Sequence, residues 1–144
     1  MRKIISIINQ KGGVGKTTTA VNLATCFSIV GKSVLLVDLD PQGNTSSSVG
    51  IDQSMRNITI YDVLIGRTDI NNAIIKTAFK LLDLIPANVN LLAAEIELIN
   101  VRSREFVLQN YLSMLSNQYD YVIIDCPPAL GLLSMNSLVA ANEI

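Results

Sequence analysis

The sequence predicts an α/β fold in which helices cover both faces of a mostly parallel sheet. Short apolar runs alternate with stretches of helical periodicity, and this order is typical of βαβ units. Charged residues make up only 16% of the 144 residues, against about 25% in an average soluble domain. A low charged fraction fits a parallel sheet covered on both faces, because its strands are continuous runs of apolar residues. The length suits a single domain spanning residues 1–144, and no linker divides it.

Four apolar runs supply the predicted strands, and right-handed crossovers between them imply one parallel sheet. These runs cover residues 3–9, 33–38, 81–85 and 121–125. Pro86 stops the third run and Pro127 follows the fourth, where proline cannot continue a strand ladder. Glu143 reads as the entrance to a further strand, so we expect the chain to be the N-terminal part of a longer domain with its later strands missing.

The segments between the strands carry helical periodicity or turn-forming residues. We expect helices over residues 16–30, 60–65, 69–76, 93–117 and 130–142. Gly31 supplies the C-terminal signal of the first helix, and Gly66 breaks the second from the third. Residues 40–50 combine Pro, Gly, Asn and serines without a period, which indicates a loop with at most a helical turn.

The glycine-rich segment KGGVGKTT separates the first predicted strand from the first predicted helix. Its glycines let successive backbone N–H groups point at one anion, and the helix N-terminus adds partial positive charge. Lys16 is placed to reach the β- and γ-phosphates of a nucleotide, and the Thr17 hydroxyl is placed to bind Mg²⁺. The expected nucleotide-binding residues are Lys11, Gly12, Gly13, Val14, Gly15, Lys16, Thr17 and Thr18.

The segment departs from the pattern G-x-x-x-x-G-K-[ST] at its first position, where the chain has Gln10 and then Lys11. Two lysines flanking G-G-x-G resemble the deviant Walker A motif of the ParA/MinD family of P-loop ATPases. The resemblance implies the P-loop NTPase fold and ATP as the nucleotide. It also implies that Lys11 reaches across a dimer interface to the nucleotide held by the other subunit.

Three carboxylates are expected to face these lysines. Asp38 and Asp40 stand at the end of the second predicted strand, and Asp125 ends the fourth. In an open parallel sheet, ligands bind outside the carboxyl ends of the strands, which is also the edge from which the glycine-rich segment leaves. The sequence therefore predicts that the carboxylates and the lysines converge on one crevice.

The resemblance also assigns roles to the carboxylates. The string DPQGN at residues 40–44 is a marker of the ParA/Soj branch, and Asp125 resembles the Walker B aspartate. By this resemblance Asp125 holds Mg²⁺ through a water, Asp38 is a more distant partner of the metal, and Asp40 orients the attacking water. The expected metal-site residues are thus Thr17, Asp38 and Asp125, and the expected catalytic residues are Lys11, Lys16 and Asp40.

The ParA/Soj resemblance implies a slow, Mg²⁺-dependent ATPase that partitions chromosomes or plasmids. Such a protein forms an ATP-dependent homodimer and binds DNA non-specifically, mostly through residues outside this chain. A ParB-like partner stimulates hydrolysis, and the protein is cytoplasmic and nucleoid-associated, with no membrane partner. The alternatives are a MinD-like membrane-cycling ATPase, a reductase like the nitrogenase iron protein, and a catalytically inert nucleotide-binding fragment.

The amino-acid composition argues against several other classes of protein. The chain has no histidine, which argues against a zinc site or a histidine-dependent hydrolase. The net charge of −1 argues against a broad basic surface for nucleic acid. No apolar run approaches the ~18 residues that a membrane-spanning helix needs. Cys26 and Cys126 are far apart in sequence, and we expect both to be free, buried thiols.

Overall fold

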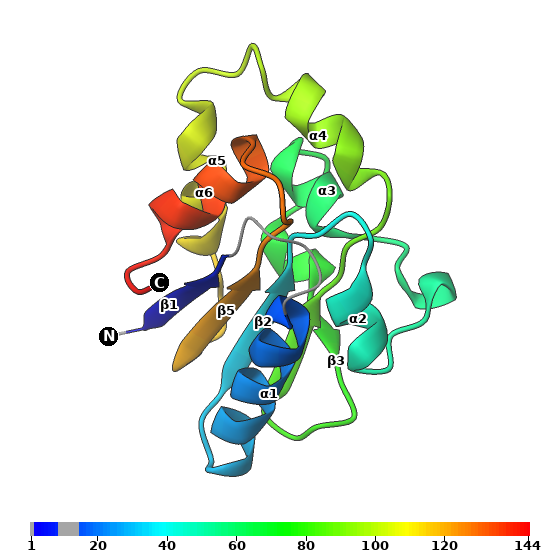
Figure 1. Cartoon of the computed structure of the whole chain (residues 1–144), viewed down its shortest axis with the longest axis vertical. Coiled ribbons are helices and arrows are strands. Elements are labelled where there is room, and N and C mark those ends of the chain that lie inside the picture. The colour runs from blue at the N-terminus through cyan, green and yellow to red at the C-terminus, as the bar shows by residue number, and fades with distance from the viewer. Residues whose placement is uncertain (1, 9–14) are drawn as a thin grey trace.

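The computed structural model describes residues 2–8 and 15–144, and these residues form one twisted sheet with helices around it (Figure 1). The strands are β1 (Lys3–Ile7), β2 (Val34–Asp38), β3 (Ile75–Lys76), β4 (Leu82–Ile85) and β5 (Tyr121–Asp125). Their order in the sheet is β1-β5-β2-β4-β3. All neighbouring pairs are parallel except β3 and β4, which are antiparallel. The predicted mostly parallel sheet is confirmed.

Helices connect these strands, together with three short 3₁₀ turns. The α-helices are α1 (Lys16–Ile29), α2 (Asn44–Ser48), α3 (Ile60–Leu64), α4 (Leu91–Glu97), α5 (Val107–Leu112) and α6 (Leu132–Ala140). The 3₁₀ turns are η1 (Gln53–Met55), η2 (Ile70–Ala73) and η3 (Arg104–Phe106). In Figure 1, α1 lies against one face of the sheet, and α5 and α6 lie beside each other near β1 and β5.

Two apolar cores cover the two faces of the sheet. Successive side chains of a strand point to opposite faces, so the fully buried strand β2 serves both cores. Val34 and Leu36 belong to the core that contains Ala20 and Ala24 of α1. The alternate residues of β2 belong to the larger core, which the helices α3 to α6 complete. Helices on both faces are therefore confirmed, and they explain the continuous apolar runs.

The register of the sheet brings three strand ends to one edge. Asp125, the last residue of β5, lies opposite Ile7 of β1 and opposite Asp38 of β2. The helix α1 begins at the same edge, directly after Gly15. The start of α1 at Lys16 therefore lies at the same edge as the strand-end carboxylates, because β5 lies between β1 and β2 in the sheet.

The single helix predicted over residues 93–117 is wrong. The helix α4 ends at Glu97, and a separate helix begins only after Ser103, whose φ of 55° lies in the left-handed region. A helix cannot pass through such a residue. The apolar residues keep a helical spacing across the break because both helices contribute to one core, and this spacing is why the sequence predicts a single helix.

The helix predicted over residues 69–76 is also wrong. Asp69 caps only the short turn η2, accepting a hydrogen bond from Asn71 N at 2.7 Å, and the chain then extends into β3. The β-branched pair Ile74 and Ile75 favours this extended backbone. In residues 40–50 the expected helical turn is the five-residue helix α2.

Two smaller expectations had different outcomes. Glu143 pairs with Ile5 in a parallel bridge, as expected for the entrance to another strand.

Cys126 is buried, as predicted, but Cys26 is exposed on α1, which corrects the expectation that both thiols are buried. Cys26 lies on a different side of α1 from Ala24, which is buried against the sheet, so its apolar neighbours in the sequence do not indicate its burial.

Candidate nucleotide-binding site

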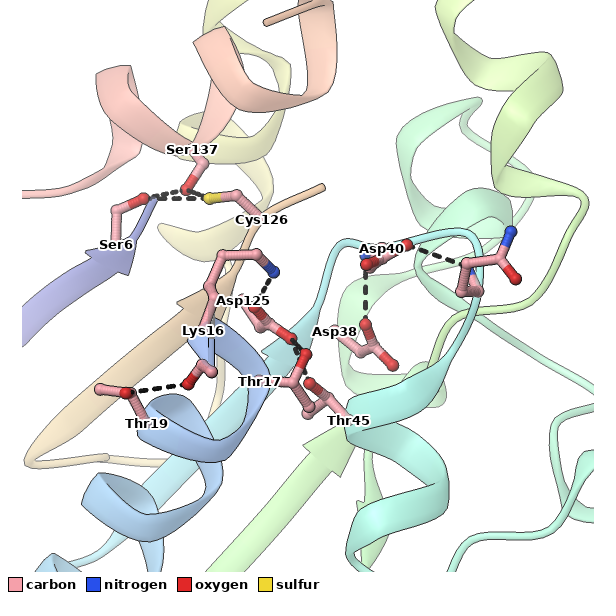
Figure 2. A network of polar contacts seen from close by, with 12 residues as sticks. Ser6, Lys16, Thr17, Thr19, Asp38, Asp40, Thr45, Asp125, Cys126 and Ser137 are labelled. Atoms are coloured by element: carbon pink, nitrogen blue, oxygen red, sulfur yellow. Dashed lines mark hydrogen bonds and ion pairs between the residues drawn. The ribbon is translucent and has the colours of Figure 1, made fainter. Parts of the chain in front are cut away.

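Asp125 is the centre of a polar cluster at the carboxyl edge of the sheet (Figure 2). Its side chain is fully buried, and both carboxylate oxygens accept hydrogen bonds. Lys16 Nζ lies 2.5 Å from Oδ1, and Thr17 Oγ1 donates to Oδ2 at 2.9 Å. The hydroxyl of Thr45, from α2, also donates to Oδ2. A buried carboxylate is stable only when its charge and lone pairs are matched in this way.

The first turn of α1 supplies two of these donors. Gly15 precedes the helix with a φ of 81°, a left-handed conformation that glycine adopts without strain. The first turn of the helix contains no acidic residue, and no side chain among the described residues caps it, so its N–H groups can donate to a bound anion. Such a helix N-terminus attracts anions. A lysine and a threonine at this position are the side chains typical of a phosphate-binding site.

Asp38 holds the loop that follows β2. Its Oδ1 accepts a hydrogen bond from Asp40 N at 3.1 Å, and its Oδ2 accepts from Ser46 N at 2.9 Å and Ser46 Oγ at 2.7 Å. Burial raises the pKa of Asp38 to about 6, while the bonds from Ser46 and Asp40 oppose this rise. Asp38 thus fixes the start of α2 directly, and its expected link to the metal remains a prediction.

The raised pKa of Asp38 makes stability depend on pH. Between about pH 4 and pH 6, the folded protein keeps a proton on Asp38 that the unfolded chain has released. The free energy of unfolding therefore falls as the pH rises through this window. We expect the difference in that free energy between the wild type and Asp38→Asn to change by about 2 kcal/mol between pH 4 and pH 7. Urea unfolding at each pH measures it, and a pH-independent difference would contradict it.

Asp40 lies in the tight turn that leads into α2. Its Oδ1 accepts a hydrogen bond from Gln42 N at 3.0 Å, and its carbonyl accepts from Gly43 N at 2.9 Å. The residue as a whole is 7% exposed. Within residues 2–8 and 15–144, no donor contacts its Oδ2, so this oxygen can accept a hydrogen bond from a water. Asp40 is therefore held in one orientation with one oxygen available.

A second polar cluster lies behind Asp125, where Cys126 Sγ donates to Ser137 Oγ at 2.8 Å (Figure 2). Ser6 Oγ also lies 3.2 Å from Cys126 Sγ. Burial raises the pKa of the Cys126 thiol, so the group stays neutral. The cluster links β1, β5 and α6, and it anchors the segment that follows Asp125.

The structure brings together Lys16, Thr17 and Asp125 as the sequence predicts, and Asp38 and Asp40 lie in the adjoining loop. Four of the predicted nucleotide-binding residues lie outside the described part of the chain: Lys11, Gly12, Gly13 and Val14. Thr18 is exposed on the first turn of α1. The analysis of the sequence missed Thr45, because its position beside Asp125 depends on the order of β2 and β5.

The oxygen atoms of Thr17 and Asp125 are suitable ligands for a magnesium ion that also binds a phosphate. In the part of the chain that the structure describes, no group of three or more His, Cys, Asp or Glu residues could hold a metal by itself. Magnesium in nucleotide sites takes only one or two protein oxygens, and phosphate and water complete its shell. The Thr17 hydroxyl and the Asp125 carboxylate are oxygens of this kind, next to the N-terminus of α1.

A parallel sheet flanked by helices, with Lys16 and Thr17 at a helix N-terminus facing Asp125, defines a P-loop nucleotide-binding protein. The family model AAA_31, described as an AAA domain, matches residues 2–144. The chain belongs to this family and is of the ParA/Soj type among P-loop ATPases.

Curated relatives support this assignment. The chain is 51% identical over 144 residues to the sporulation initiation inhibitor protein Soj of Bacillus subtilis, covering all of this chain and 57% of that protein. It is 46% identical over 144 residues to the chromosome-partitioning ATPase Soj of Treponema pallidum, covering all of this chain and 56% of that protein. The chain thus spans little more than half the length of these relatives.

A solved structure supports the fold and the kind of ligand. The cobyrinic acid a,c-diamide synthase of Mycobacterium smegmatis, with bound ADP and magnesium, superposes with a TM-score of 0.94 at 41% identity. The match covers 98% of this chain and 57% of that one. Its name describes another activity than those of the Soj proteins, so the common fold does not by itself decide the biological task.

None of the helices in the described residues is both long enough and apolar enough to cross a bilayer.

Proposed function

We propose that the chain binds Mg²⁺-ATP and hydrolyses it as the N-terminal portion of a single ParA/Soj-type ATPase domain that serves chromosome or plasmid partition. The convergence of Lys16 and Thr17 on the buried Asp125 carries this proposal. An ammonium, a hydroxyl and a carboxylate at a helix N-terminus are the groups that a triphosphate with magnesium requires. The ADP and magnesium bound by the similar M. smegmatis protein support it.

Each residue has a defined task in this proposal. Lys16 would move from Asp125 to the phosphates when nucleotide binds, and Thr17 and Asp125 would hold a magnesium ion. Such an ion would supply positive charge that neutralises the phosphates. Asp40 orients the attacking water with its available oxygen, because a loose phosphoryl-transfer transition state needs little base strength. Asp38 fixes the turn that carries Asp40.

Hydrolysis further depends on a second copy of the protein. In this part of the proposal, Lys11 reaches the phosphates in the partner subunit and stabilises the transition state, as an arginine finger does in other P-loop enzymes. The dimer with ATP binds DNA non-specifically, and a ParB-like partner stimulates hydrolysis. The protein works in the cytoplasm on the nucleoid. The relatives named Soj support the role in partition.

Replacing Lys11 by alanine tests the dimer. We expect Lys11→Ala in the intact protein to lower the ATP hydrolysis rate about a hundredfold, because a cation supplied in trans stabilises transition-state charge. Steady-state phosphate release measures the rate, and light scattering with ATP measures dimerisation. Lys80→Ala removes an exposed lysine elsewhere and is the control. A Lys11→Ala protein that dimerises and hydrolyses ATP like the wild type would refute this role.

The competing functions predict different results with the intact protein. The ParA/Soj proposal predicts Mg²⁺-ATP binding by calorimetry, slow hydrolysis, and a faster rate with DNA and the ParB-like partner. ATP-dependent binding to anionic lipid vesicles, without binding to DNA, would favour a MinD-like cycle instead. Nucleotide binding without hydrolysis under any of these conditions would indicate an inert module. Absence of Mg²⁺-nucleotide binding would refute the proposal.

A further inference from the structure

Arg56 is a buried cation that the nucleotide site does not explain. It follows η1 and is 4% exposed. Its guanidinium donates to the carbonyl of Ile51 from Nε at 3.1 Å and from Nη2 at 2.7 Å. Nη1 donates to the carbonyl of Ala87 at 3.2 Å, and Nη2 donates to Ser47 Oγ at 2.8 Å. Among the described residues, no carboxylate forms an ion pair with it.

Burial of a cation that is held only by uncharged acceptors is costly, and an apolar side chain of similar size often packs at lower cost. The contacts of Arg56 therefore need a reason other than core stability. They join α2, through Ser47, and the turn after α2, through Ile51, to the loop after β4, which is distant in the sequence and is bound through Ala87. A planar group with five donors suits such a junction better than a lysine does.

The turn that carries Asp40 rests on the same guanidinium. Gly43 has a φ of 68°, and a Cβ atom there would lie 2.4 Å from Arg56 Nη1 and 3.0 Å from the Ala87 carbonyl oxygen. Only a residue without a side chain fits this close approach. Gly43 N in turn donates to the Asp40 carbonyl at 2.9 Å, so the guanidinium lies two short contacts away from Asp40.

A second link joins this junction to Asp38. Ala87 N donates to Ser46 Oγ at 3.2 Å, and Ser46 donates to Asp38 through both its hydroxyl and its backbone N–H. The helix α2 is thereby fixed on one side by Asp38 and on the other by Arg56. The same helix carries Thr45, which donates to Asp125.

We propose that Arg56 is a positioning residue for nucleotide hydrolysis: it holds the turn 40–43 against α2 so that Asp40 faces the phosphate site. The inference rests on the proposed function, whose hydrolysis it refines. The hydrogen bonds of Arg56 do not reach Lys16, Thr17 or Asp125, so Arg56 acts on the orientation of Asp40 and leaves the phosphate-binding groups as they are.

The test is Arg56→Met in the intact protein, which keeps an unbranched apolar stem and removes the guanidinium with all of its donors. We expect kcat for ATP hydrolysis to fall about tenfold, because small displacements of a catalytic group are costly, while the Kd for Mg²⁺-ATP stays within about twofold. Arg2→Met is the matched control. Arg2 also donates to backbone carbonyls, those of Leu112 and Asn117, but it lies before β1, at the opposite end of the sheet, and its loss leaves kcat unchanged.

A double-mutant cycle separates positioning from general stability. If Arg56 acts through Asp40, Arg56→Met adds no further loss of kcat to Asp40→Asn. Independent, multiplying losses, an unchanged kcat, or equal losses for Arg2→Met and Arg56→Met would overturn the inference. A wild-type protein that does not hydrolyse ATP would instead refute the proposed function. Should Arg56→Met not fold, Ser47→Ala removes one acceptor from the exposed side of α2, and the same cycle with Asp40→Asn decides.

Discussion

Lys16→Met is expected to abolish nucleotide binding and to destabilise the fold as well. Lys16 Nζ lies 2.5 Å from Asp125 Oδ1, and the two side chains are 8% and 0% exposed. The ammonium thus forms an ion pair with a fully buried carboxylate, and in the proposed function it is also the group that reaches phosphate when nucleotide binds. We expect Mg²⁺-ATP affinity to fall by more than about a hundredfold, which leaves no binding that calorimetry detects, and the free energy of unfolding to fall by about 3 kcal/mol. Calorimetry and urea unfolding measure the two losses.

The double variant Lys16→Met with Asp125→Asn separates these two losses. Since the buried negative charge is then gone, we expect the free energy of unfolding to recover most of the loss, while nucleotide binding stays absent. Lys3→Met is the control for an ion pair at the surface. Lys3 Nζ lies 2.8 Å from Glu143 Oε1, but both side chains are about half exposed, so little change in stability is expected. Wild-type affinity in Lys16→Met would contradict the assignment of the site.

Asp40→Asn is expected to stop hydrolysis while nucleotide binding remains. Asparagine keeps the Oδ1 acceptor for Gln42 N, so the turn before α2 should fold as in the wild type. It replaces the available carboxylate oxygen by an amide group that cannot accept a hydrogen bond from the attacking water. We expect kcat to fall about a hundredfold, with the Kd for Mg²⁺-ATP within about twofold. Single-turnover phosphate release and calorimetry measure these quantities.

Asp69→Asn is the matched control for Asp40→Asn. Asp69 accepts a hydrogen bond from the backbone N–H two residues later, as Asp40 does, but it caps η2 on the surface and not the turn before α2. We expect its hydrolysis rate to equal that of the wild type. A full hydrolysis rate in Asp40→Asn would show that another group orients the water.

The sequence alone predicts those parts of the fold and of the site that depend on residues close together in the chain. The apolar runs of β2 and β5 and the signature KGGVGKTT located the sheet, the helix α1 and the cluster of Lys16, Thr17 and Asp125. The positions of Asp38 and Asp40 followed from the rule that parallel strands end at one edge. The residues Lys11–Val14 lie outside the described residues, so their roles remain predictions.

Other features depend on contacts that are distant in the sequence. Thr45 meets Asp125 because β5 lies beside β2, and Arg56 meets Ala87 because the chain folds back after β4. Neither residue belongs to a motif of fixed spacing, so no local signal could have found them. The break at Ser103 was missed for a related reason, since tertiary packing there overrides the helical spacing.

The antiparallel strand β3 has a consequence for the behaviour of the protein in concentrated solution. It terminates the row of strands beyond β4, and it is only two residues long. One of these residues is Lys76, whose side chain is 85% exposed. A short edge strand with an exposed ammonium offers few unpaired backbone groups to the strand of another molecule, and pairing would desolvate the charge. This edge of the sheet therefore resists the intermolecular strand pairing that leads to aggregation.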